Sequence, residues 1–256
     1  MYLNHLFVLI LLAHALADFC LQNDSAVGLK KNSITIQIKH AIILFCVSLL
    51  LLIPFISMKI MILVLLLSLS HFVIDFAKMQ LDPDNTSLEL FITDQILHVF
   101  VIIALTPLLN SINLNSYIIS VWAWIVNHYS FLKHISSIDL ISYIVLLICY
   151  LFTINGGAII VRLFLNKYNS LKNEPEETNV NVGEFIGKLE RIIILTLVIN
   201  GYYSAIGYVI AAKSIARYKK LGDDKQFGEY YLVGTLLSVL IALMFGLIYN
   251  CISKYI

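Results

Sequence analysis

Three apolar segments of the chain each carry one histidine and one aspartate four residues apart. The pairs are His14 with Asp18, His71 with Asp75 and, in the reverse order, Asp94 with His98. In a helix, residues i and i+4 lie on one face, about 6 Å apart along the axis, so each pair can bind one ion together. Neutral imidazole and carboxylate are ligands that zinc, manganese and iron accept in proteins. We therefore treat these six residues as candidate metal ligands.

The first two pairs belong to a pattern that occurs twice. The motif H-x-x-x-D-F begins at His14 and again at His71, and a further histidine follows each motif, His40 after the first and His98 after the second. The separations between these histidines are 26 and 27 residues. The pattern predicts a duplicated helical hairpin. In it, His40 is expected to be a further ligand or a general base.

Two glutamines, Gln22 and Gln95, lie close to the pairs in sequence and are expected to donate hydrogen bonds within a catalytic site. A bound metal would ionise a water molecule for hydrolysis. The same polar groups could instead carry protons or a transported cation. They could also serve only as polar contacts that hold helices together. All three interpretations remain open from the residues alone.

The composition places these groups in a membrane protein. Hydrophobic residues make up 60% of the 256 residues and charged residues only 13%, whereas a soluble domain has about 25% charged residues. The net charge of +1 gives no electrostatic basis for binding nucleic acid. The four cysteines form no C-x-x-C pair, so neither a disulfide framework nor a thiolate zinc site is indicated.

The apolar segments predict an all-α, polytopic helical membrane bundle of seven or eight transmembrane helices. Seven segments are long enough to cross a bilayer: 2–22, 40–57, 58–78, 90–109, 138–163, 187–212 and 228–251. Residues 117–133, which hold both tryptophans, form either a short eighth span or an interfacial helix. The lysine- and arginine-bearing loops 23–39 and 213–227 are both expected in the cytoplasm, which requires eight spans.

The chain is expected to divide into three parts. Residues 1–164 form an N-terminal transmembrane bundle that carries the His/Asp cluster, 165–184 form a polar acidic linker, and 185–256 form a C-terminal two-helix region. Because the first and third spans end on the side where the second and fourth begin, the His/Asp pairs should share one depth near the cytoplasmic interface.

The C-terminal spans show features of packing rather than of chemistry. Small residues recur every four positions in the last span, and Gly207 and Ala211 of the preceding span are expected to supply the matching face. The small residues are Gly234, Ser238, Ala242 and Gly246. Glu190 and Arg191 are interpreted as a local ion pair close to a helix end.

Several motifs resemble a bacterial family of multi-spanning membrane proteins that is catalogued as a domain of unknown function. In the first half these are L-L-A-H-A-L-A-D-F-C-L-Q, H-F-V-I-D-F-A-K and D-Q-I-L-H. In the second half, I-G-K-L-E-R, A-A-K-S-I-A-R and E-Y-Y-L-V-G-T-L-L-S are similar to the longer members of that family. The resemblance implies a bacterial inner (cytoplasmic) membrane protein and supplies no reaction.

We therefore expect a metal-dependent membrane hydrolase that acts on a lipid or a lipid-linked substrate. The cofactor would be a divalent metal, zinc or manganese, and the partner would be membrane lipid, with protein partners unknown. A proton- or cation-coupled transporter and a non-catalytic membrane scaffold are the alternatives. The small number of prolines, four in all, gives no sign of the broken helices typical of carriers.

Overall fold

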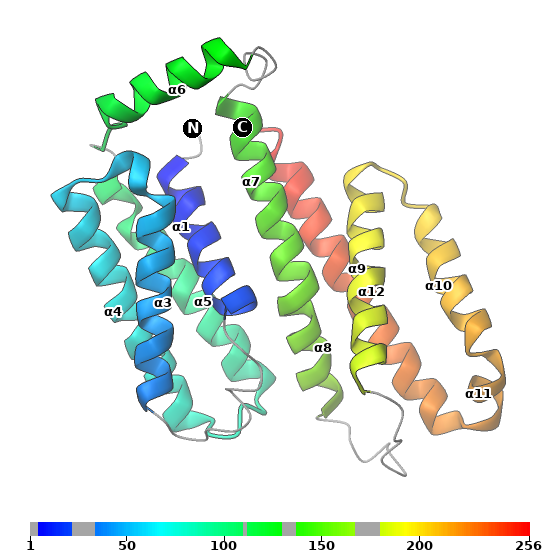
Figure 1. The fold of residues 1–256 in the computed structure, drawn as a ribbon. Helices are drawn as coiled ribbons and strands as arrows, with labels where there is room; N and C mark the ends of the chain where they lie inside the picture. The colour runs from blue at the N-terminus through cyan, green and yellow to red at the C-terminus, as the bar shows by residue number, and fades with distance from the viewer. Residues whose placement is uncertain (1–4, 22–33, 110–111, 130–136, 167–179) are drawn as a thin grey trace. The chain divides into compact units, whose positions relative to one another are not determined.

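The computed structural model describes residues 5–21, 34–109, 112–129, 137–166 and 180–256 (Figure 1). All regular structure within these ranges is helical and none of it is strand, which confirms the all-α prediction. The chain forms two compact units, one of residues 1–148 with 255–256 and one of residues 149–254. The linker predicted at 165–184 lies mostly outside the described residues and stays a prediction.

Four helices of the first unit form a ring. α1 touches α3 and α5, α3 touches α4, and α4 touches α5 (Figure 1). Their apolar faces meet in a core that includes Ile10, Leu52, Ile60, Val64 and Ile102. The elements are α1 His5–Leu16 with the π-helical turn η1 Ala17–Leu21, α3 Ile34–Leu51, η2 Ile53–Phe55, α4 Met58–Leu81, α5 Leu88–Leu105, η3 Thr106–Leu109 and α6 Ser116–His128.

Polar residues at the helix ends fix where these helices begin. The Ser57 hydroxyl accepts a hydrogen bond from the Ile60 amide at the start of α4, and the Ser87 hydroxyl accepts one from the Leu90 amide at the start of α5. Between α4 and α5, the Asp82 carboxylate accepts hydrogen bonds from the Thr86 and Ser87 amides at 3.1 and 2.8 Å. This turn joins α4 and α5 over a short distance and so sets their relative register.

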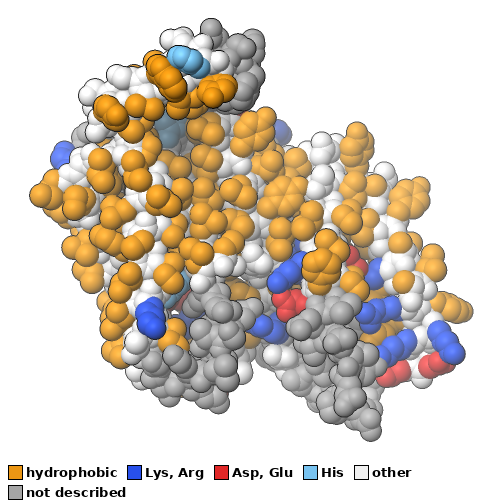
Figure 2. All heavy atoms as spheres, in the orientation of Figure 1, with side chains coloured by type: hydrophobic (Ala, Val, Ile, Leu, Met, Phe, Trp, Pro, Cys, Tyr) orange, Lys and Arg blue, Asp and Glu red, His pale blue; other side chains and the backbone are white. Residues whose placement is uncertain are grey.

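Among the described residues, five helical segments are long and apolar enough to cross a membrane. They are Ile34–Leu51, Met58–Leu81, Leu88–Leu109, Asp139–Asn166 and Lys225–Ile252. Two further apolar helical segments, His5–Leu21 and Ala205–Ala216, are shorter. Figure 2 shows hydrophobic side chains over most of the visible face of α3 and α4, as expected for a surface that meets lipid.

The segment that contains both tryptophans forms α6, which has 13 residues and buries none of them. It is not among the membrane-length helices of the described residues. Residues 130–136, which would extend it, lie outside the described part of the chain.

The second unit corrects one predicted span. α9 Val180–Ile199 ends at a turn, and α10 Ala205–Ala216 follows as a separate helix. The single span predicted at 187–212 is therefore wrong. Gly201 in this turn has a φ of +75°, a left-handed conformation that glycine adopts without the strain of a Cβ. The remaining elements are α7 Ser137–Leu151, which runs from the first unit into the second, η5 Phe152–Gly156, α8 Gly157–Asn166, α11 Tyr218–Asp223 and α12 Lys225–Ile252.

The small-residue stripe of α12 packs against α9. A Cβ added to Gly246 would overlap the Val198 side chain, and Ser238 accepts a hydrogen bond from Arg191 of α9. Gly207 of α10 has no atom within 4 Å of where its Cβ would stand, and Ala211 is exposed. The face that packs against the small residues of α12 therefore lies on α9, and not at Gly207 and Ala211, where it was predicted.

Arg191 is buried in the second unit and is not at a snorkelling helix end. Its Nη2 donates to the Ile154 carbonyl at 3.1 Å, and its Nη1 donates to Ser238 Oγ at 3.0 Å. Ile154 lies in the π-helical turn η5, which breaks the regular hydrogen-bond ladder. Glu190 forms an ion pair with Lys213 of α10, so its interactions are not limited to the predicted local pair with Arg191.

We predict that Gly246→Ala destabilises the α9–α12 contact, because the new methyl group has no room beside Val198. Overpacking of this kind costs about 1–3 kcal/mol of unfolding free energy. Gly207→Ala is the matched control, because its position is open. Thermal unfolding of both purified variants in detergent is the measurement. Equal stability of the two variants would show that α12 does not approach α9 this closely.

Candidate metal centre

The ring of α1, α3, α4 and α5 brings all six predicted ligands, together with His40, into one cluster. Five of these side chains are buried, with exposed fractions of 2% to 4%: His14, His40, His71, Asp94 and His98. The side chains of Asp18 and Asp75 are 8% and 13% exposed. A polar cluster of this size inside an apolar bundle is costly unless its members satisfy one another.

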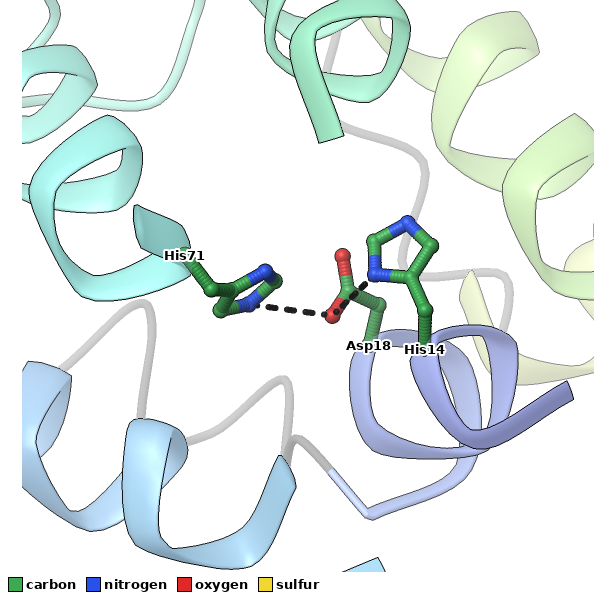
Figure 3. Close-up of side chains that lie close together, drawn as sticks. All are labelled: His14, Asp18 and His71. Carbon is green, nitrogen blue, oxygen red and sulfur yellow. Dashed lines mark ion pairs between the residues drawn. The ribbon is translucent and has the colours of Figure 1, made fainter. Parts of the chain in front are cut away.

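Asp18 is placed by the π-helical turn that ends the first helix. Its Oδ1 atom lies 3.5 Å from His14 Nδ1 and 3.4 Å from His71 Nε2, and Figure 3 shows it between these two rings. His14 and Asp18 come from α1 and η1, whereas His71 comes from α4. Turns of the π type are rare and often mark functional sites. Here the turn aims a carboxylate at the neighbouring helices.

Four donor atoms from three elements lie close to one another. They are Asp18 Oδ1, His40 Nε2, His71 Nε2 and Asp75 Oδ2, from η1, α3 and α4. Their separations are 2.9 Å between the two nitrogens, 3.2 and 3.4 Å from Asp18 to His40 and His71, and 3.7 and 3.4 Å from Asp75 to the same two atoms. Metal–ligand distances of about 2.0–2.2 Å give tetrahedral edges of about 3.3–3.6 Å. The five separations lie between 2.9 and 3.7 Å, on either side of these values.

Hydrogen bonding alone does not satisfy this arrangement. His40 Nε2 faces two carboxylate oxygens and another imidazole nitrogen within 3.7 Å, yet an imidazole nitrogen carries at most one proton. The same holds for His71 Nε2, which faces Asp18, Asp75 and His40. A cation beside the two nitrogens would contact both of them together with a carboxylate oxygen. These residues could therefore hold a metal ion.

A second group of donors adjoins the first. His98 Nε2 lies 3.2 Å from Asp75 Oδ1 and 3.3 Å from Asp94 Oδ1, and this trio could also hold an ion. Lys78 Nζ donates to Asp94 Oδ2 at 2.9 Å. Lys78 was not among the predicted site residues, although it follows Asp75 by three residues and so lies on the same face of α4.

The two predicted glutamines have different outcomes. Gln95 Nε2 donates to Asp18 Oδ2 at 3.1 Å, so it orients a candidate ligand and is a positioning residue. Gln22 lies outside the described residues, and its predicted role stays a prediction.

A small cavity with room for about one water molecule borders the cluster. His14, His71 and His98 line one part of it, and Ser48 and Ser70 add hydroxyl groups. The rest of the lining is apolar, from Ile10, Leu44, Leu67, Val101 and Ile102. The serines gave no signal in the sequence, because single serines are common in membrane helices.

With the geometry established, comparison with known proteins adds one result. Residues 6–126 match the family described as "Protein of unknown function (DUF3307)". Residues 6–126 are a DUF3307 domain. The match includes every residue of the cluster and ends within α6, before the second unit begins. No curated protein and no solved structure matches the chain. The likeness of the second half to longer family members stays a prediction.

We predict that Gln95→Leu weakens metal binding by the DUF3307 domain, because Asp18 loses the hydrogen bond that orients it. Loss of such an outer contact commonly costs about 10–100-fold in affinity. Gln37→Leu on α3 is the matched control, since Gln37 contacts Met79 rather than the cluster. Titration of metal-depleted protein with zinc, followed by calorimetry, is the measurement. Equal affinities would contradict a positioning role.

Proposed function

We propose that this protein is a metal-dependent membrane hydrolase that acts on a lipid or a lipid-linked substrate. The observation that supports it best is the set of two imidazole nitrogens and two carboxylate oxygens, in which each oxygen lies within 3.7 Å of both nitrogens. A dication among two carboxylates and two neutral imidazoles is electrically balanced, which suits a buried site. Zinc or manganese fits this ligand set.

Hydrolysis needs a water molecule that can give up a proton, and a group that takes it. A bound divalent metal supplies the first requirement, because it lowers the pKa of water bound to it. His14 borders the cavity and lies near Asp18, so it is placed to accept the proton. Water then adds its oxygen to the electrophilic centre, the ester bond to the lipid breaks, and the leaving oxygen takes the proton that His14 accepted. His40 belongs to the ligand set in this proposal rather than acting as the base.

The apolar surroundings suggest where the substrate comes from. Three of the helices around the cluster, α3, α4 and α5, expose large hydrophobic side chains, such as Ile42, Leu65, Leu97 and Phe100. A lipid can therefore reach the protein from within the bilayer. The partly exposed members of the cluster and its surroundings are Asp18, Asp75, Lys78 and Gln95, so we propose that the reacting group approaches on their side.

One observation favours the transporter alternative. The π-helical turn Ala17–Leu21 interrupts the first apolar helix next to Asp18, and interrupted helices form ion sites in carriers. A carrier would use the same groups to bind a proton or cation and release it on the other side. A non-catalytic scaffold would keep the cluster only for helix association. Metal content and flux distinguish these functions.

We predict that purified wild-type protein contains zinc or manganese and that His71→Ala loses the metal and the hydrolase activity together. His71 is shared by two of the donor groups, so its loss removes more than an outer contact would. His128→Ala is the matched control, because His128 is exposed on α6. Elemental analysis and release of a head group from lipid vesicles are the measurements.

The outcomes separate the three functions. Wild-type protein without metal, even after incubation with zinc or manganese, would exclude the hydrolase. A structural cluster predicts that His71→Ala costs only about 0.6–2 kcal/mol of helix association and leaves the cellular phenotype intact. A carrier predicts normal folding of the variant with loss of pH-dependent flux in proteoliposomes.

We also propose that the chain lies in the inner membrane of a bacterium and crosses it eight times. The break at residues 200–204 supports this count, because α9 then crosses the membrane in one direction and α10 crosses it in the other. If the α9–α10 hairpin enters the bilayer without crossing it, its two ends still lie on the same side of the membrane. Loops 23–39 and 213–227 are then both cytoplasmic with α6 at the interface, which agrees with their basic residues. Figure 2 shows Lys and Arg gathered around α11.

We predict that a cysteine at Lys219 of a cysteine-free variant is inaccessible to an impermeant thiol reagent in intact cells. Lys254→Cys is the matched control, since α12 lies between the two positions and should place Lys254 outside. Labelling in cells before and after permeabilisation is the measurement. Labelling of position 219 in intact cells would show that the hairpin does not return the chain to the cytoplasm.

A further inference from the structure

We propose that the cluster holds two divalent metal ions bridged by Asp75, and that this two-ion centre binds a phosphate group of the substrate. The inference rests on the proposed metal-dependent function and specifies its substrate class. The main observation is the placement of the two carboxylate oxygens of Asp75. Asp75 Oδ2 faces His40 and His71, whereas Asp75 Oδ1 faces His98. A carboxylate with its oxygens aimed at two separate groups of nitrogens has the form of a bridge.

The second position has its own donor set. His98 Nε2, Asp75 Oδ1 and Asp94 Oδ1 come from two helices, α4 and α5, that the Asp82 turn holds in register. The two separations to His98, 3.2 and 3.3 Å, again match the spacing expected around a metal ion, about 3.3–3.6 Å. Three protein ligands leave a position open for substrate, as catalytic zinc sites do.

Asp94 shows most clearly that something is to be bound there. Its Oδ1 atom is buried and makes no hydrogen bond to any described residue, although it lies 3.3 Å from His98. Its other oxygen, Oδ2, is occupied by Lys78. A buried carboxylate oxygen without a hydrogen bond is costly. A metal ion shared with His98 would contact this oxygen and remove the cost.

The charges indicate what else must bind. Three carboxylates and the Lys78 ammonium sum to −2, so one dication neutralises the cluster and a second leaves it at +2. A buried site with that charge requires an anion. A phosphate monoester carries about −1.5 to −2 charges at neutral pH. Two-metal sites with ions about 3.5–4 Å apart occur in phosphatases and nucleases, where they stabilise both oxygens of the displacement.

The test is the number of metal ions bound by the full-length protein in detergent. Metal-depleted wild type is titrated with Mn²⁺, with and without inorganic phosphate, and ions per chain are counted. We expect two ions per chain with phosphate, and an exchange-coupled signal in electron paramagnetic resonance that shows a shared ligand. Asp94→Asn should bind one ion with an uncoupled signal. Glu89→Gln, also on α5, is the matched control and should bind two.

The outcomes distinguish this inference from the proposed function. One ion per chain in wild type under both conditions would overturn the two-ion centre and leave a metal-dependent hydrolase. No ion would overturn both. Two ions without exchange coupling would overturn the Asp75 bridge. If Asp94→Asn fails to fold, the wild-type stoichiometry and signal still decide the question.

Discussion

The contact on which the first unit depends is that between buried carboxylates and imidazoles. Asp18, Asp75 and Asp94 each bring a charge into a bundle whose surface is apolar, and an unpaired aspartate at the centre of a membrane helix costs about 2.5–3.5 kcal/mol. Each of them lies within 3.5 Å of at least one histidine from the cluster. The helices must therefore bring four segments together at one depth, and any register that separates them leaves charges unpaired.

This requirement gives a reason for the local details of the ring. The Asp82 turn fixes the offset between α4 and α5, so Asp75 and His98 meet although they point from different helices. The π-helical turn at Ala17–Leu21 places Asp18 toward α3 and α4. Both devices are short, and each contains an aspartate whose carboxylate makes the contacts. The apolar core around Val64 and Ile102 supplies the stability, while these polar contacts select one arrangement.

The second unit also buries a charged side chain, Arg191, and also contains a π-helical turn that contacts it. Arg191 donates hydrogen bonds to the Ile154 carbonyl, which lies in a π-helical turn, and to the Ser238 hydroxyl. The close approach of α9 and α12 depends on Gly246, since any larger residue would meet Val198. This unit lies outside the DUF3307 match. Its contacts support architecture, and the chemistry that the residues suggest is concentrated in the domain that the family shares.

The sequence by itself determined the helical class, the candidate ligands and the pairing of His with Asp within single helices. These depend on composition and on the 3.6-residue period, which are local properties. Only the tertiary structure decided that His40 joins Asp18, His71 and Asp75, because contacts between helices depend on register and on turns. It also decided that residues 187–212 form two helices, since one glycine at positive φ reverses an apolar segment that hydropathy alone presents as continuous.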